Sequence, residues 1–149
     1  MKEKRNVLLI DDDSIDNFVN KKMILHYGFA DNVIEFISPV SALDYLKRLD
    51  AVPEKSKQAP DLILLDVNMP LMSGPEFLEQ FERLSAGMKS HCRIVILSGV
   101  LNGREHYGVI QSKHVIAIMP KPLIKMNLDY LEEVMARKRP GPLISLLRY

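Results

Sequence analysis

The chain of 149 residues has no tryptophan and a single cysteine, Cys92. One cysteine cannot form an intramolecular disulfide, and such low cysteine use is typical of proteins in a reducing compartment. We therefore expect a cytoplasmic protein without disulfide bonds.

Long apolar stretches and an excess of charge of one sign are also absent. The apolar runs are far shorter than the roughly 18 residues that span a bilayer, and the first is too short for a secretory signal. A net charge of +1 gives no electrostatic reason to expect binding to nucleic acid or to a membrane surface. With 26% charged and 47% hydrophobic residues, the composition is that of one globular domain.

The chain does contain five short apolar runs that alternate with segments of helical period. The runs are continuous rather than alternating in polarity, which is typical of strands covered on both faces. The expected strands are residues 7–10, 33–37, 62–65, 93–97 and 115–119.

Helices are expected between these strands. They are predicted to begin near Ser14, Ser38 and Ser73, and to span about 103–112 and 125–138. This alternation predicts an α/β fold of the doubly wound, flavodoxin-like type, with a five-stranded parallel sheet in the order 2-1-3-4-5 and five helices. Glu35 interrupts the second strand, which places that strand at an edge.

Polar side chains follow four of the expected strands. Asp11, Asp12 and Asp13 follow the first, Asp66 the third, Ser98 the fourth, and Lys121 comes just after the fifth. The carboxyl ends of parallel strands lie along one edge of a sheet, where such folds bind ligands. We therefore expect these groups to share a crevice that can hold a divalent cation and neutralise a phosphoryl group.

Each of these signals has a simpler explanation when taken alone. The three aspartates could cap the first helix, and Asp66 could cap the loop that follows it. A Lys-Pro pair usually marks only a turn. The order of the signals over successive strand ends favours a common site. The carboxylates of such a site would repel one another, so in the absence of a metal ion one of them should have a raised pKa.

In these motifs the chain resembles the CheY-like response-regulator receiver family. The motifs are LIDDD at 9–13, DLILLDVNMPLMSG at 61–74, ILSG at 96–99, and Lys121-Pro122. The resemblance covers about residues 5–138. It implies a stand-alone, single-domain response regulator of a two-component or phosphorelay system.

The resemblance implies that Asp66 accepts a phosphoryl group from a sensor histidine kinase or a histidine phosphotransfer protein. Ser98 and Lys121 would contact the phosphoryl group, and the Lys121–Pro122 bond would be cis. The protein would catalyse only its own phosphorylation and dephosphorylation, and it is otherwise not an enzyme. Phosphorylation would switch a surface that binds a downstream protein, which the sequence does not identify.

The family also implies a Mg²⁺ site, with Mn²⁺ as a substitute ion. Asp12 and Asp66 would bind the ion directly, Asn68 through its backbone carbonyl, and Asp11 through a water molecule. Oxygen ligands of this kind suit a hard cation that keeps several waters.

Two residues depart from the family pattern. Ile118 stands where the family usually has an aromatic residue that rotates on activation, and Pro120 removes a backbone donor at the end of a strand. Phosphate acceptance is therefore better supported than any particular output conformation. A degenerate receiver that acts as a phosphorylation-independent binding scaffold is the alternative function.

A magnesium-dependent phosphohydrolase of the haloacid dehalogenase type is a further alternative. It would need a second aspartate two positions after the nucleophile, where this chain has Asn68.

We expect a receiver domain over residues 1–138 and a C-terminal extension over 139–149. The extension contains an apolar segment after Pro-Gly-Pro. It either folds back over the domain or forms a docking or dimerisation segment. A homodimer is therefore one of the expected alternatives.

Overall fold

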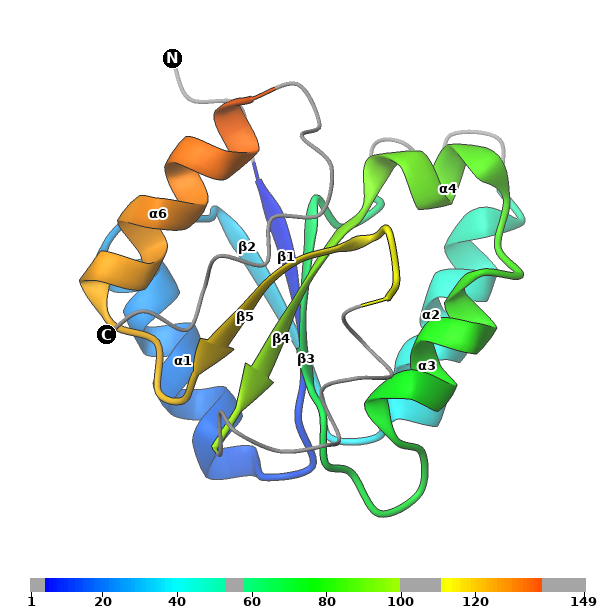
Figure 1. Cartoon of the computed structure of the whole chain (residues 1–149), viewed down its shortest axis with the longest axis horizontal. Helices are drawn as coiled ribbons and strands as arrows, with labels where there is room; N and C mark the ends of the chain where they lie inside the picture. The colour runs from blue at the N-terminus through cyan, green and yellow to red at the C-terminus, as the bar shows by residue number, and fades with distance from the viewer. Residues whose placement is uncertain (1–4, 53–57, 100–110, 138–149) are drawn as a thin grey trace.

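The computed structural model describes residues 5–52, 58–99 and 111–137. Five parallel strands form one sheet in the order β2-β1-β3-β4-β5, which confirms the predicted fold class (Figure 1). The strands are β1 (Asn6–Ile10), β2 (Asn32–Phe36), β3 (Leu62–Asp66), β4 (Arg93–Ser98) and β5 (Val115–Pro120). β2 lies at one edge, as the position of Glu35 indicates.

Helices cover both faces of this sheet, as Figure 1 shows. α1 (Ser14–His26) and α6 (Lys125–Ala136) lie on one face. α2 (Pro39–Asp50), α3 (Gly74–Phe81) and α4 (Ala86–His91) lie on the other. Among the described residues, none of the helices is both long and apolar enough to cross a membrane.

The strands divide their side chains between two cores. In β3, Ile63 and Leu65 pack with residues of α2 and α3, whereas Leu62 and Leu64 pack with residues of α1 and α6. Both faces are covered, so every residue of β3 is buried, and the strand is continuously apolar from Leu62 to Leu65. Replacing a leucine by alanine in such a core lowers the free energy of unfolding by about 2–5 kcal/mol. The tightly packed sheet therefore holds the ends of its strands, and the loops that follow them, in fixed positions.

The predicted starts of α2 and α3 are confirmed by their caps. The Ser38 hydroxyl accepts the N–H of Ser41, and the Ser73 hydroxyl accepts the N–H of Glu76. A serine hydroxyl at this position satisfies one of the N–H groups that a helix leaves free at its start.

The prediction for the region after α3 was incomplete. The helix that begins after Ser73 ends at Phe81, and the short helix α4 follows with Ser85 as its N-cap. α4 has six residues, and Met88 is the buried one, so it has no apolar period that a sequence pattern could reveal. The helix predicted at 103–112 lies almost wholly outside the described residues, as does the extension at 139–149.

The inner face of α1 is polar. Ile15 and Phe18 are 69% and 57% exposed, although their spacing marks the helix in the sequence. Asn17, Asn20 and Ile24 are the buried residues of α1. The two asparagines hydrogen-bond to loops at the carboxyl end of the sheet, so this face of α1 supports the residues described next.

Candidate functional site

Three carboxylates meet at the carboxyl ends of β1 and β3. Oxygen atoms of Asp11, Asp12 and Asp66 lie within 4.8 Å of one another. The two strands are neighbours, with Ile10 opposite Leu65, so the residues that follow these positions come together. Asp11 and Asp66 are only 2% and 4% exposed, whereas Asp12 is exposed to solvent.

The loop between β1 and α1 is fixed by its own side chains. The Asp13 carboxylate accepts the N–H groups of Ile15 and Asp16 and caps α1. The Asp13 N–H donates to Asp11 Oδ1 at 2.9 Å, and Asn17 Nδ2 donates to the carbonyl oxygen of Asp11 at 3.0 Å. The capping role therefore belongs to Asp13, while Asp11 and Asp12 contribute to the carboxylate group.

Lys121 reaches the carboxylates from the end of β5. Its Nζ lies 3.0 Å from Asp11 Oδ2, 2.8 Å from Asp16 Oδ2 and 3.6 Å from Asp66 Oδ1. The Lys121–Pro122 bond is cis, as the family resemblance implies.

The loop that carries Lys121 is tied to α1. The N–H of Leu123 donates to Asn20 Oδ1 at 3.0 Å, and both residues are buried. Because a buried N–H without a partner costs about 1–3 kcal/mol, this bond stabilises the loop in one position.

Asp16, Asn17 and Asn20 were missed in the sequence. Asp16 lies four residues before Asn20 and Asn17 lies three residues before it, and residues at these intervals share one side of a helix. The helical interval between these polar residues was the available signal. The apolar residues Ile15 and Phe18 of the same helix suggested instead that a different face of α1 packs against the sheet.

Ser98 and Asn68 border the carboxylates. Ser98 is buried at the end of β4, and its carbonyl accepts the N–H of Lys121 at 3.2 Å. Its neighbour Leu97 is paired with Asp66 across the sheet. The N–H of Asn68 donates to Asp66 Oδ1 at 3.4 Å, and Asn68 itself is exposed.

Burial and, for Asp66, a neighbouring negative charge raise the pKa of two carboxylates of the site. Burial, followed by the negative charge of Asp11, raises the pKa of Asp66 to about 7, although Lys121 acts in the opposite direction. Burial also raises the pKa of Asp11. For Lys121, burial lowers the pKa, but hydrogen bonds to Asp16 and Asp11 outweigh it and leave the pKa above its usual value.

The carboxylates fit a hard divalent cation. They offer oxygen ligands alone, and Mg²⁺ is usually held by one or two carboxylates together with waters. A cation would also relieve the repulsion that raises the pKa of Asp66.

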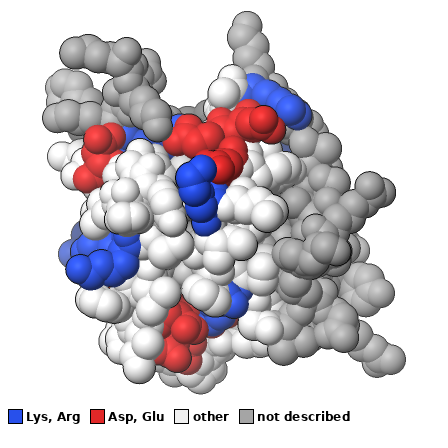
Figure 2. All heavy atoms as spheres, turned by 90° about the vertical axis from the view of Figure 1, so that its left-hand side faces the viewer, with Lys and Arg blue, Asp and Glu red and all other residues white. Residues whose placement is uncertain are grey.

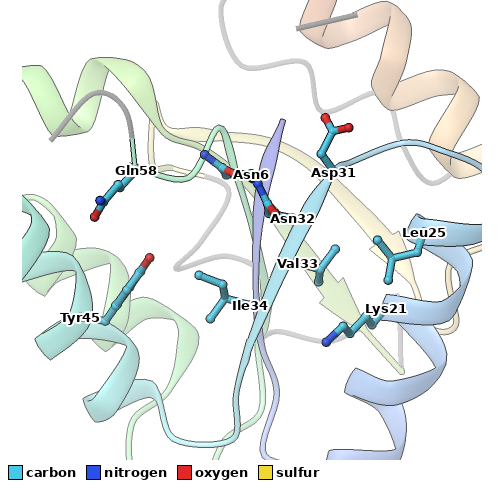
Figure 3. A pocket seen from close by; sticks show the side chains of 9 residues that line it. All are labelled: Asn6, Lys21, Leu25, Asp31, Asn32, Val33, Ile34, Tyr45 and Gln58. Carbon is cyan, nitrogen blue, oxygen red and sulfur yellow. Dashed lines mark hydrogen bonds between the residues drawn. The ribbon is translucent and has the colours of Figure 1, made fainter. Parts of the chain in front are cut away.

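A separate groove of about 550 Å³ runs along the outer edge of β2 (Figure 3). Lys21 and Leu25 of α1 line one side, and Tyr45 of α2 lines the other. Its acidic side chain, Asp31, accepts the N–H of Arg5 at 2.9 Å. This groove contains no cluster of reactive groups among its described lining, so the carboxylate group is the candidate site.

The comparisons with known proteins agree with this fold. A family model described as the response regulator receiver domain matches residues 7–128. A two component response regulator from Cytophaga hutchinsonii is 28% identical with a TM-score of 0.81, over 92% of this chain and 100% of that one.

Two further structures are similar. A response regulator receiver protein from Dyadobacter fermentans is 26% identical with a TM-score of 0.75, over 90% of this chain and 99% of that one. The receiver domain of a histidine kinase from Arabidopsis thaliana shares the fold. It is 22% identical with a TM-score of 0.76, over 89% of this chain and 91% of that one. No curated protein sequence matches the chain.

Proposed function

Because the chain belongs to the response regulator receiver domain family, we propose that it is a phosphate acceptor in a two-component or phosphorelay system. Receiver domains are signalling domains rather than classical enzymes, and in general they interact with histidine kinases or phosphotransfer proteins. In this chain Asp66 is the acceptor. One of its carboxylate oxygens attacks the phosphorus of a phosphohistidine, the P–N bond breaks, and the imidazole leaves with the electron pair.

The contrast between the two buried carboxylates supports Asp66 as the acceptor. Asp11 is held at 2.9–3.0 Å by the Asp13 N–H and by Lys121. Asp66 has longer contacts, at 3.4 Å to the N–H of Asn68 and 3.6 Å to Lys121. An oxygen that is less engaged in hydrogen bonds is more available for attack.

The surrounding residues neutralise charge and fix positions, which is most of what phosphoryl transfer requires. Asp11, Asp12, Asp66 and Asn68 would hold Mg²⁺ or Mn²⁺, which offsets the negative charge of the carboxylates and the phosphoryl group. Lys121 pairs with a phosphoryl oxygen. The Ser98 hydroxyl donates to another phosphoryl oxygen.

The partner that supplies the phosphoryl group docks beside α1. Ile15 and Phe18 are exposed on this helix, and Ile124 is 49% exposed just after the Lys121 loop. On the face that carries α1 and α6, charged side chains lie in small groups of both signs, separated by uncharged surface (Figure 2). An apolar contact therefore suits this face better than attraction by net charge. We place these events in the cytoplasm.

Phosphorylation biases a surface that binds a downstream protein. Ser98 is the residue through which the phosphoryl group would act, since it ends β4 beside Lys121. Ile118 is 2% exposed and packs in the core with α2 and α3, so the output does not depend on rotation of an aromatic ring at this position. If the protein does not accept phosphate, Ile118 in place of the family's usual aromatic residue favours the alternative of a phosphorylation-independent binding scaffold.

Incorporation of label from radiolabelled acetyl phosphate tests the proposal. We expect Mg²⁺-dependent labelling of the wild type, no labelling of Asp66→Asn, and labelling that is slower by about tenfold or more in Lys121→Gln. Asp31→Asn is the control, because Asp31 pairs with Arg5 at the opposite end of the sheet. A folded wild-type protein that binds Mg²⁺ but takes up no label would support the scaffold instead.

A further inference from the structure

We propose that Asp16 is a positioning residue that draws Lys121 away from Asp66 before phosphorylation and thereby slows phosphate acceptance. The proposal rests on the function assigned above. It adds to the site a residue that contacts neither the phosphoryl group nor the cation and acts through the ammonium group of Lys121.

The distances around Lys121 carry the inference. In the described part of the chain, Asp16 makes the shortest of three carboxylate contacts, at 2.8 Å, and Asp11 follows at 3.0 Å. Both contacts are hydrogen bonds, whereas the 3.6 Å separation from Asp66 is an ion pair without one. The ammonium therefore lies nearer to α1 than to the acceptor carboxylate.

Asp16 is fixed for this contact by its place on α1. It lies in the first turn, and its N–H donates to the Asp13 carboxylate at 3.3 Å. Among the described residues, the group of three carboxylates whose oxygens all lie within 4.8 Å of one another is Asp11, Asp12 and Asp66, and Asp16 is outside this group. Its contribution to the site is a negative charge directed at Lys121.

A phosphoryl group on Asp66 brings oxygens that compete for the same ammonium, which has three N–H donors. Of the two carboxylates bonded to Lys121, the Asp11 side chain is 3% exposed and that of Asp16 is 36% exposed. Water can replace Lys121 at Asp16 more readily than at Asp11. The Asp16 contact is therefore the one that weakens when Lys121 moves to the phosphoryl group.

Replacing Asp16 by asparagine removes this attraction and one negative charge beside an anionic reactant. Because a partly exposed ion pair is screened by water, we expect labelling from acetyl phosphate to be about two- to fivefold faster in Asp16→Asn. Beryllofluoride, a non-covalent phosphoryl analogue, should bind more tightly by about the same factor. Asp16→Glu keeps the carboxylate and should label at nearly the wild-type rate.

Asp129→Asn is the matched control. It removes the same charge from an exposed helical carboxylate, which contacts Lys125 at 2.9 Å rather than Lys121. We expect Asp129→Asn to label at nearly the wild-type rate.

A second comparison separates action through Lys121 from a structural effect. In a Lys121→Gln background, Asp16→Asn should no longer change the labelling rate, because the ammonium is absent. An acceleration that persists in this background would overturn the proposal, as would an unchanged or slower rate for Asp16→Asn alone. A wild type that takes up no label overturns the proposed function and this inference together, whereas a labelled wild type without acceleration in Asp16→Asn overturns this inference alone.

Discussion

Asp11 and Asp66 are buried side by side at the ends of neighbouring strands, but their partners differ. Lys121 and a backbone N–H hold Asp11, while Asp66 has longer contacts and a pKa raised to about 7 by burial and by Asp11. At the scale of single residues, Asp11 is therefore the more tightly held carboxylate, and Asp66 is the less constrained one, as its proposed role as acceptor requires.

The raised pKa predicts a dependence of stability on pH in the metal-free protein. Between about pH 4 and the folded pKa of about 7, folded Asp66 binds a proton that the unfolded chain has released. The free energy of unfolding therefore falls as the pH rises through this range. Asp66→Asn cannot titrate, so its stability relative to the wild type should rise by up to about 4 kcal/mol over the same range.

Urea unfolding in EDTA at about pH 4 and about pH 8 measures this difference. Adding Mg²⁺ at the higher pH should reduce it, because a cation offsets the repulsion between the carboxylates. A stability difference between Asp66→Asn and wild type that is the same at both pH values would show that Asp66 has an ordinary pKa.

The sequence indicated Asp66 and Lys121 because each comes at the end of an apolar run. Asp16 gave no such signal. An acid in the first turn of a helix is common, since it interacts favourably with the helix dipole, and only the folded chain brings Lys121 to it from 105 residues away.

At the scale of elements, α1 connects the two loops that build the site. Asn17 holds the carbonyl of Asp11, and Asn20 holds the N–H of Leu123 beyond Lys121. Through these bonds, the buried polar face of α1 sets the position of both the carboxylates and the ammonium.

Removal of the Asn20 side chain tests this role of α1. Asn20→Ala leaves the buried N–H of Leu123 without its partner, so we expect a loss of stability of about 1–3 kcal/mol and slower phosphate acceptance. Urea unfolding and labelling from acetyl phosphate measure the two effects. Asn32→Ala serves as the control, because Asn32 bonds to Asn6 on the exposed edge of the sheet.

Asn20→Ala and Asn32→Ala should therefore differ clearly in both stability and labelling rate. Asn32→Ala should change the stability by no more than about 0.5 kcal/mol and leave labelling unchanged. If Asn20→Ala were as stable and as active as Asn32→Ala, the loop that carries Lys121 would not depend on α1.

Local chemistry made the starts of α2 and α3 predictable, because a serine cap acts within three residues of itself. The inner face of α1 was not predictable in the same way. Asn17 and Asn20 are buried because distant loops supply their partners, and no local pattern contains that information.

At the scale of the whole molecule, the fold follows from strands such as β1, β3 and β4 that are apolar on both faces. Such strands require helices on each side, and the right-handed connections between parallel strands leave few arrangements. The order of the sheet was therefore predictable, and the order in turn brings Asp11, Asp66 and Lys121 to one edge.

The described core predicts where the receiver domain ends. Val134 is the last buried apolar residue described, near the end of α6, and Arg93 of β4 donates to the carbonyls of Val134 and Arg137. A chain that ends at Lys138 should therefore unfold cooperatively and label from acetyl phosphate at the wild-type rate. Failure of this shortened chain to fold would show that the domain needs residues 139–149.

The most direct test of the account is the intact mass of the protein after incubation with acetyl phosphate and Mg²⁺. We predict the addition of a single phosphoryl group that hydroxylamine removes, as expected for an acyl phosphate, and no addition in EDTA or in Asp66→Asn. A phosphoryl group of the same lability on Asp66→Asn, or an unmodified wild type that is folded and binds Mg²⁺, would contradict the account.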